Sequence, residues 1–573
     1  MKRMKIMTVL LLTLVLCFTA CGQQNINAEK DILAEEGEKI TGVVATGTAS
    51  ASVTVTSLDV SDMFTDRDKE IGYDEESCAR IVLQGSSAES TDSGVKINGT
   101  TVTITGEGTY LISGNLQNGS IIVDAEKTDK IQLVLDNVNI SCDSCAAVYI
   151  KQADKVFITL APDSENVLTN TGEFVAIDDN NIDGAIFSKD DLTLNGLGSL
   201  TVSSEYGHGV VSKDDLVITG GSYRVTAAGH GISGKDSVRI AEGSIQITAG
   251  KDGIHSGNDE EEELGFVYIA GGDIVLSVDD DGIHGEAQVL ISDGNIQITK
   301  SYEGIEGKSI EIAGGTIALT ASDDGLNATN GSEEGFGFGK PGKNMTDSSN
   351  AVDTANTGLD VYILISGGKI SIKANGDGID SNGALYVTGG ETYVSGPENS
   401  GNGALDYGGE AKITGGVLIA VGASGMAMNF GSDSTQGSML VNISDYQQSG
   451  SMIELKDSQG NVLISYEAQS RYNSVLVSCP EIQLDSTYTL IAGEISNEIT
   501  MTELIYGSSN DRGMGGFGGG FMRGGEKSKL PEGEMPNRER PKLSEGEIPN
   551  EGKPELPEGE MPDGQMENPP EFR

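Results

Sequence analysis

The sequence predicts an all-β protein, built as a three-faced parallel β-helix in which strands of successive coils stack, with a small C-terminal antiparallel β cap. Three observations favour this fold. A short text recurs through the chain, apolar and polar residues alternate within each copy, and the body is rich in Gly and almost free of Pro. No segment carries the 3.6-residue apolar period of a helix.

Each repeat opens on an acidic residue or His followed by Gly, which we call the anchor pair. The glycines of these pairs step by 25, 22, 22, 29, 22, 21 and 53 residues. In the unit that opens at Asp281, Ile283, the pair Val289 and Ile291, and the pair Ile296 and Ile298 mark three short strands with one buried face each. Such a unit cannot bury its apolar face alone, so neighbours must stack in parallel register. Leucine-rich repeats would need an asparagine ladder and a helical segment, and a propeller blade would need about 40 residues.

The N-terminus is typical of a secreted lipoprotein. Three basic residues, a short apolar stretch and Ala20 precede Cys21, so residues 1–21 are expected to be a signal peptide and Cys21 the lipidated residue. The protein would then lie outside the cell, held on a bacterial membrane by its lipid. A simple secretion signal with release of the protein is the alternative.

Composition divides the remainder of the chain. We expect a linker over 22–60, the β-helix over 61–436 and an antiparallel β cap over 437–506, where the repeat is lost but alternation persists. Residues 507–573 are Gly-rich and then acidic and Pro-rich, a composition that predicts disorder.

Two repeats carry extra residues at the same point of the unit, over 256–266 and roughly 328–360. Insertions at equivalent positions must leave a solenoid from one edge. The two loops are therefore expected to wall a short trough over the coils that open with Gly282 and Gly304, although both could also be mere decoration.

Charge limits the partners. Lys and Arg total 37 against 87 Asp and Glu, a net charge of −50. This charge repels phosphate, so nucleic-acid binding is excluded, and it favours divalent cations.

The stacking predicts where a cation would bind, because the anchor acids fall into one column and repel each other unless a cation neutralises them. Numerous oxygen ligands suit calcium. The alternative is that Asp in Asp-Gly only caps turns. The candidate metal ligands are Asp252, Asp279, Asp280, Asp281, Glu303 and Asp324.

Histidine and cysteine give weaker signals. All four His fall in the repeats, where they could bind metal or act as acid and base, but outward-facing strand residues are the commoner explanation. Cys142 and Cys145 form a lone CxxC without a second pair, so a zinc site is unsupported. A turn disulfide and two buried thiols both remain open.

The repeat text, with DGIHS, KDDLTI and GG-x-I-x-I-T-A, together with the lipoprotein start and the ending ELIYG, resembles a family of bacterial cell-surface carbohydrate-binding β-helix proteins. That family is related in fold to calcium-dependent pectate lyases. The resemblance covers roughly residues 80–506. It implies a right-handed coil, bound calcium, and recognition of cellulose or acidic, pectin-like polysaccharide without turnover, with acids such as Asp252, Asp280, Asp281 and Asp324 at the coil edges.

Two functions of different class follow, besides a passive surface stalk. The first is a non-catalytic protein that holds polysaccharide through calcium bridges. The second is a calcium-dependent lyase, which would need a basic residue to abstract a proton, and Lys300 is the candidate. The chain has no Trp, so a flat stacking platform for glucan is not expected. The candidate substrate contacts are Tyr268, His284, Lys300, Tyr302 and Glu306.

Overall fold

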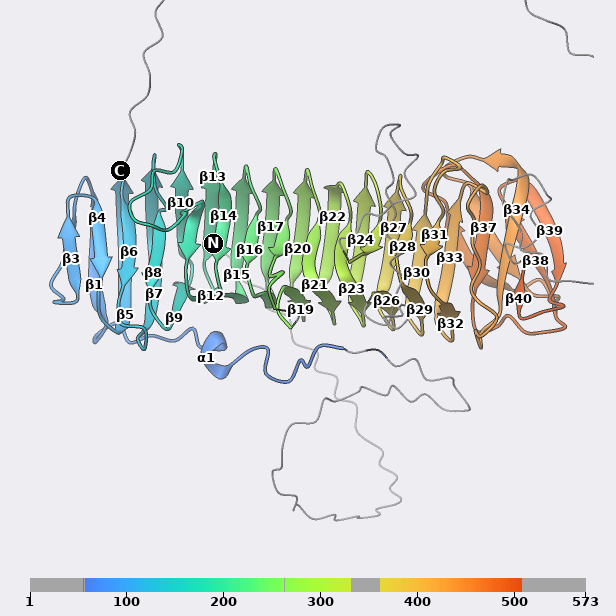
Figure 1. Cartoon of the computed structure of the whole chain (residues 1–573), viewed down its shortest axis with the longest axis horizontal. Helices are drawn as coiled ribbons and strands as arrows, with labels where there is room; N and C mark the ends of the chain where they lie inside the picture. Colours follow the sequence, from blue (N-terminus) through green and yellow to red (C-terminus); the bar gives the residue numbers. More distant parts are fainter. Residues whose placement is uncertain (1–54, 56, 262, 331–360, 508–573) are drawn as a thin grey trace, which may run out of the picture. The chain divides into compact units, whose positions relative to one another are not determined.

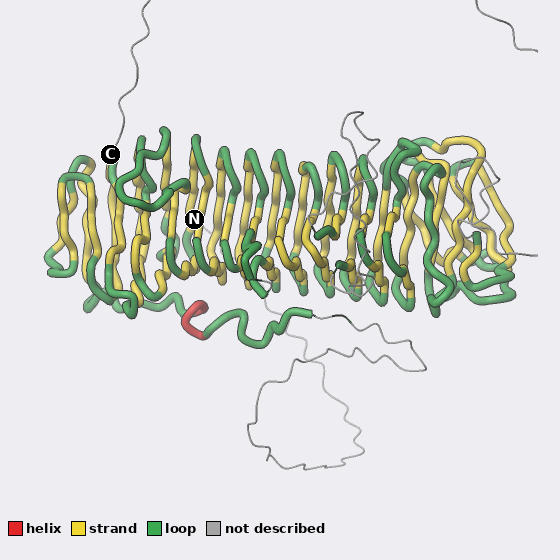
Figure 2. The backbone as a smooth tube through the Cα atoms, in the orientation of Figure 1, coloured by secondary structure: helices red, strands yellow, loops and turns green. Residues whose placement is uncertain are grey.

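The structure, a computed structural model, describes residues 55, 57–261, 263–330 and 361–507, and these belong to one unit. Apart from the four-residue helix α1 (Asp66–Lys69), the regular elements of these residues are strands, and successive repeats pair in parallel. The prediction of an all-β chain with parallel strands is confirmed. Figure 1 shows the strands of the repeats following one another in chain order along the stack, and Figure 2 shows the turns that separate them.

Three ladders of strands run through the repeats. The first contains the short strand that follows each anchor pair; for example, Ile254 of β18 pairs with Ile283 of β21, which pairs with Ile305 of β23. Its strands are β4 (Thr101–Ile104), β6 (Ser120–Asp124), β8 (Val148–Gln152), β11 (Gly184–Ser188), β14 (His208–Ser212), β16 (Ile232–Gly234), β18 (Ile254–Ser256), β21 (Ile283–Ile291), β23 (Ile305–Ile312), β25 (Leu326–Ala328), β28 (Ile379–Ser381) and β31 (Leu405–Tyr407).

The second ladder continues from the first, and the long strands β21 and β23 contribute to both. Its other strands are β1 (Ala79–Gly85), β5 (Gly108–Gln117), β7 (Lys130–Cys142), β9 (Lys155–Leu160), β12 (Asp191–Gly196), β15 (Asp215–Ala227), β17 (Ser237–Ala249), β19 (Phe266–Ile269), β26 (Tyr362–Ile365), β29 (Ala384–Val387) and β32 (Ala411–Ile413).

The third ladder completes each coil, and the later parts of β5, β7, β15 and β17 belong to it. Its other strands are β10 (Glu165–Asn170), β13 (Ser199–Ser204), β20 (Asp273–Val278), β22 (Asn295–Ser301), β24 (Thr316–Ala321), β27 (Lys369–Ala374), β30 (Glu391–Ser395) and β33 (Val417–Gly422). At the N-terminal end, β2 (Ala88–Ser90) and β3 (Val95–Asn98) pair antiparallel with β1 and β4.

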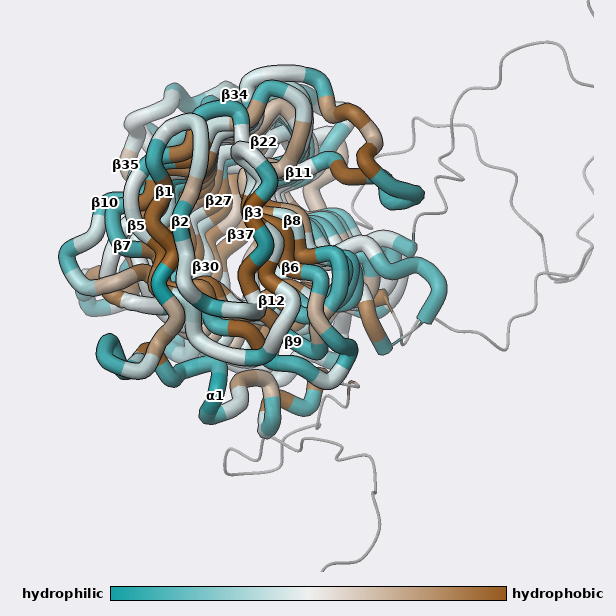
Figure 3. Tube along the Cα trace, turned by 90° about the vertical axis from the view of Figure 1, so that its left-hand side faces the viewer, coloured by the Kyte–Doolittle hydropathy of each residue, from teal (hydrophilic) through white to brown (hydrophobic). Residues whose placement is uncertain are grey.

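The core lies inside the coils, because alternate residues of each strand point inward. The apolar residue after each anchor glycine shows this most simply: Ile254, Ile283 and Ile305 are completely buried and stack on one another. Viewed along the stack, hydrophobic residues gather toward the inside (Figure 3).

The anchor glycines are required by close packing between coils. A Cβ on Gly304 would lie 2.3 Å from the carbonyl oxygen of Gly325 in the next coil, and a Cβ on Gly325 would lie 2.4 Å from that of Gly378. Since real Cβ atoms do not approach backbone oxygens this closely, any side chain here must push two coils apart.

Gly304→Ala is therefore expected to lower the free energy of unfolding by roughly 1–3 kcal/mol, the usual cost of overpacking. Thermal or denaturant unfolding of the purified protein measures the effect. Gly72→Ala is the matched control, because nothing lies within 4 Å of the added Cβ there. Equal unfolding midpoints for the two variants would contradict the packing argument.

An N-terminal strap, defined as residues 57–78, lies along the second ladder. Ser57 donates a hydrogen bond to Glu311 of β23 (2.8 Å), and Met63 packs with Phe266 and Tyr268 of β19. Further along, Asp68 of α1 reaches β9 and β12. Contact with the strands thus begins before residue 61, at Ser57 of the segment expected to be a linker.

The C-terminal region changes from parallel to antiparallel pairing. β33 pairs antiparallel with β37 (Tyr472–Ser478), which pairs antiparallel with β34 (Ser438–Gln447), and β40 (Ile505–Tyr506) lies beside β34. Ile419 and Val421 of β33 share a core with Ile453 and Leu490 of this region. A separate antiparallel sheet contains β35 (Met452–Lys456), β36 (Val462–Glu467), β38 (Thr487–Ala492) and β39 (Ile495–Thr500).

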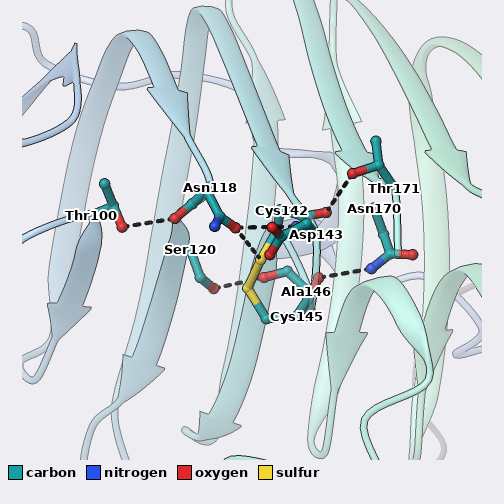
Figure 4. Close-up of a disulfide and its surroundings, with 9 residues drawn as sticks. All are labelled: Thr100, Asn118, Ser120, Cys142, Asp143, Cys145, Ala146, Asn170 and Thr171. Atoms are coloured by element: carbon teal, nitrogen blue, oxygen red, sulfur yellow. Dashed lines mark hydrogen bonds between the residues drawn. A yellow bond between two sulfur atoms is a disulfide. The ribbon is translucent and has the colours of Figure 1, made fainter. Parts of the chain in front are cut away.

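Cys142 and Cys145 form a disulfide in the turn between β7 and β8, so the turn disulfide is the alternative that the structure adopts (Figure 4). Polar contacts hold the turn against neighbouring coils: Ser120 donates to the carbonyl of Ala146 (2.7 Å) and Asn170 to that of Cys145 (3.3 Å). Within the described residues no helix has the length and apolar character needed to cross a membrane.

Several predictions lie outside the described residues. They concern the signal peptide over 1–21 with Cys21, most of the linker over 22–60, the larger inserted segment and the tail after Gly507.

Candidate functional site: stacked acids and histidines

Two parallel rows of polar residues run along the first ladder. Because Ile254, Ile283 and Ile305 pair with one another, the residues two positions before them also lie one above the other. The first row, the anchor row, contains His208, His230, Asp252, Asp281, Glu303, Asp324 and Asp377.

The second row follows three residues after each anchor and is called the outer row. Its pairings are direct: His255 with His284, His284 with Glu306, Glu306 with Asn327, and Asn327 with Asp380. In the N-terminal direction the same row is apolar, and Tyr149 and Phe187 pack beneath residues Phe174 and Ile182 of the connection after β10. Its polar part contains Ser233, His255, His284, Glu306, Asn327, Asp380 and Asp406.

The rows together form two carboxylate clusters that could hold a cation. Asp281, Glu303 and Glu306 make the first, and Asp324, Asp377 and Asp380 the second. In each, one carboxylate oxygen from every residue lies within 4.8 Å of the others. Hard oxygen donors gathered at this separation suit calcium.

Turn capping uses one oxygen of the anchor carboxylates and leaves the other. Oδ1 of Asp252 accepts a hydrogen bond from the backbone N–H of Asp281 (3.2 Å), and Oδ1 of Asp281 accepts from that of Glu303 (3.3 Å). Oδ1 of Asp324 accepts likewise from Asp377 (2.5 Å). Turn capping therefore accounts for the Oδ1 atom of each of these carboxylates, but not for the Oδ2 atom.

Asn327 supplies an observation that fits a bound cation. Its side chain is only 9% exposed and its Nδ2 donates to Glu303 (2.8 Å), but its Oδ1 is buried without a hydrogen-bond partner. A buried carbonyl oxygen left without a donor is costly, whereas calcium readily takes such a ligand. Its place between Glu306 and Asp380 in the outer row puts it among the carboxylates.

Crowding of the acids opposes their ionisation. Burial, followed by repulsion from Glu306, raises the pKa of Glu303 to about 9. Burial also raises the pKa of Asp324 to about 7, that of Asp380 to about 7 and that of Asp377 to about 6, with neighbouring acids adding to the rise in each. A cation bound among these acids would stabilise their ionised forms and so lower their pKa values.

Histidine rings occupy the N-terminal end of the rows. The four rings form one stack, with centroid separations of 4.8 Å from His208 to His230, 4.2 Å to His255 and 5.2 Å to His284. Burial acts to raise the pKa of Asp252, but contact with His230 and His255 outweighs it and lowers that pKa.

His284 joins the histidine stack to the acids. Its Nδ1 lies 3.3 Å from Oδ2 of Asp281 and 2.9 Å from Oε2 of Glu306. Burial opposes its charge, but the carboxylates of Asp281, Glu286 and Glu306 raise its pKa to about 12. The predicted substrate contacts His284 and Glu306 therefore lie among the predicted metal ligands Asp281 and Glu303.

The other predicted site residues lie elsewhere. Asp279 and Asp280 are exposed and belong to neither cluster, and Asp279 instead forms an ion pair with Lys300. Tyr302 is 48% exposed and precedes Glu303. Tyr268 is buried under the strap, with its ring 5.8 Å from that of Phe64, so the expectation that it lines a substrate trough is wrong.

The two insertions do leave from equivalent points. The first joins β18 to β19 and the second joins β25 to β26, each a passage from the first ladder to the second. Since most of the second insertion lies outside the described residues, the trough remains a prediction.

Asn327 and Asp406 are absent from the sequence-predicted site residues. The signal was their spacing. Asn327 follows its anchor glycine by two residues, as His255, His284 and Glu306 follow theirs, and Asp406 pairs in register with Asp380 of the neighbouring strand. Aligning that second column, in addition to the anchors, would have found them.

Part of the chain matches known proteins. Residues 98–340 match the model of a family described as carbohydrate-binding domain-containing protein. A protein of the same description from Acetivibrio thermocellus is 40% identical over 153 residues, which are 26% of this chain and 53% of that protein. This chain thus spans about half the length of the curated relative that it matches.

A solved structure of a polysaccharide lyase-like protein from C. thermocellum, obtained as a gadolinium derivative, is 35% identical. The alignment covers 44% of this chain and 98% of that chain, with a TM-score of 0.38, too low to establish a common fold. The family match contains the anchor row from His208 to Asp324, while Asp377 and Asp380 lie beyond it.

Proposed function

We propose that this chain is a non-catalytic polysaccharide-binding lipoprotein of the bacterial cell surface, built on a right-handed, three-faced parallel β-helix and loaded with calcium. Its ligand would be an acidic, pectin-like polysaccharide or cellulose. The observation that carries the proposal is the pair of stacked carboxylate clusters on one ladder, with the unpartnered Oδ1 of Asn327 among them. The carbohydrate-binding family match over 98–340 supports the class of ligand.

Calcium resolves a conflict of charge. A chain with net charge −50 repels uronate polymers, unless a cation lies between the two sets of carboxylates. Asp281, Glu303 and Glu306, or Asp324, Asp377 and Asp380 with Asn327, would hold the ion through oxygen. Bound there, calcium supplies positive charge to which a uronate carboxylate can bind.

The lyase alternative needs a free base at the clusters. Lys300 is on β22 of the third ladder, its ammonium is paired with Asp279, and both side chains are 63% exposed. This favours a solvated surface ion pair over a base held against substrate. We therefore retain lyase activity only as an outcome that the assay would detect.

The test measures retention of the purified protein on polygalacturonate and, separately, on cellulose, with calcium or with EDTA. We expect calcium-dependent retention on the acidic polymer and no ultraviolet absorbance from unsaturated product. Asp377→Asn combined with Asp380→Asn should weaken retention about tenfold or more, because two of three charged ligands of one cluster are lost.

Asp279→Asn is the matched control, since this exposed acid belongs to neither cluster. Retention that EDTA leaves unchanged on every polymer would overturn the calcium bridge. Growing absorbance that disappears in Lys300→Ala would establish the lyase instead.

A further inference from the structure

The histidine end of the two rows differs chemically from the carboxylate end. Here His230 and Asp252 of the anchor row meet His255 of the outer row, and one ligand atom from each lies within 4.8 Å of the others. Nδ1 of His255 is 2.7 Å and Nδ1 of His230 is 3.0 Å from the same oxygen, Oδ2 of Asp252. Asp252 is 4% exposed, so these atoms meet in a largely enclosed place.

Hydrogen bonding does not account for the whole arrangement. Nδ1 of His230 is buried and makes no hydrogen bond, although the carboxylate oxygen is at hydrogen-bonding distance, because the pair is not aligned for one. Asp252 uses Oδ1 to accept from the backbone of Asp281 and so keeps Oδ2 for the rings. The ring stack and the strand pairing of His255 with His284 fix the rings in position.

The geometry fits a metal smaller and softer than calcium. Zn²⁺ binds imidazole nitrogen and carboxylate oxygen at about 2.0–2.1 Å, which places neighbouring tetrahedral ligands about 3.3 Å apart. Two nitrogens around one oxygen at 2.7 and 3.0 Å need only a small expansion to reach that spacing. Calcium prefers six or more oxygens, which two imidazoles do not offer.

We propose that His230, Asp252 and His255 bind a divalent transition-metal ion of the Zn²⁺ class, distinct from any calcium on the carboxylate clusters. Three protein ligands leave the fourth tetrahedral position for water or for an oxygen of a bound ligand. The rows then sort cations by donor type, with nitrogen at one end and oxygen at the other. The proposal is independent of whether the chain binds polysaccharide.

The test titrates the full purified chain, stripped of metal, with Zn²⁺ in millimolar calcium, by calorimetry and by metal analysis after desalting. Co²⁺ in place of Zn²⁺ should give the visible absorption of a tetrahedral nitrogen and oxygen site. We expect one retained equivalent, and His230→Gln and His255→Gln should each weaken zinc binding by roughly tenfold or more, as loss of a ligand requires.

His208→Asn is the matched control, because His208 stacks on His230 but its Nδ1 accepts the backbone N–H of His230, a role that an Asn oxygen can fill. It should retain the zinc equivalent. Thermal unfolding in EDTA verifies that the variants are folded. The proposal is overturned if the wild type retains no zinc, if calcium displaces it, or if the Gln variants bind as the wild type does.

Discussion

Asp68→Ala is expected to release the N-terminal strap and to cost up to about 3–5 kcal/mol, the range for removing one partner of a buried ion pair. Asp191, 3.8 Å from the same Lys155 ammonium, compensates part of the loss. Asp68 is 1% exposed, and its Oδ1 contacts both the ammonium of Lys155 (2.9 Å) and the hydroxyl of Thr193 (2.7 Å). Its Oδ2 accepts hydrogen bonds from the backbone N–H (3.0 Å) and the hydroxyl (2.7 Å) of Thr65, the residue that caps the N-terminus of α1. Removal of one carboxylate thus breaks the cap and the anchor together.

Hydrogen exchange of residues 57–78 measures the release, because a strap that detaches loses protection without global unfolding. Asp66→Ala is the control: it lies in the same helix but is exposed, so its effect should stay within about 0.5 kcal/mol. Asp68→Asn keeps the shape and should lie between the two. If protection of the strap is the same in wild type and Asp68→Ala, the anchor is not Asp68.

The same contact has a defined pH dependence. Burial acts to raise the pKa of Asp68, but the hydrogen bonds from Thr193 and Lys155 lower it to about 2. A depressed acid stabilises the folded state fully above its unfolded pKa, near 4, and the contribution is lost as pH falls from there toward 2. The strap is therefore expected to detach first on acidification.

The repeats were predictable because each one is a short, continuous sequence that recurs at a regular spacing. The anchor glycines follow from a single contact, Gly304 against the carbonyl of Gly325, which is repeated coil after coil. The strap was not predictable in this way. Its contacts join residues as far apart as Ser57 and Glu311, and no period marks a segment that crosses many coils once.

The site was partly predictable for the same reason. Register placed Asp281, Glu303 and Asp324 in one column, as expected from their spacing. Asp279 and Asp280 precede the anchor residue Asp281 at an exposed corner. Although they are its neighbours in sequence, they do not belong to its carboxylate cluster. Tyr268 was misplaced because alternation shows that a residue points outward but not what covers it.

Glu303→Gln is expected to stabilise the metal-free protein at alkaline pH while weakening its calcium binding. The pKa of Glu303 is raised to about 9, first by burial and then by Glu306, from a value near 4.5 in the unfolded chain. A raised acid binds more protons when folded, so stability falls as pH rises between the two values, by about 1.4 kcal/mol for each pH unit. Gln cannot ionise and still accepts from Nδ2 of Asn327.

Thermal unfolding in EDTA from pH 5 to pH 9 should therefore show a difference in stability that grows with pH. Near pH 5 the wild type and the variant should unfold at the same temperature, and near pH 8 the variant should be several kcal/mol more stable. Calcium should reverse the order, since it stabilises the ionised carboxylate that the variant lacks. Glu107→Gln, at an exposed glutamate, is the control and should follow the wild type throughout. A gap between Glu303→Gln and wild type that does not change with pH would mean that ionisation of this column does not limit the stability of the metal-free protein.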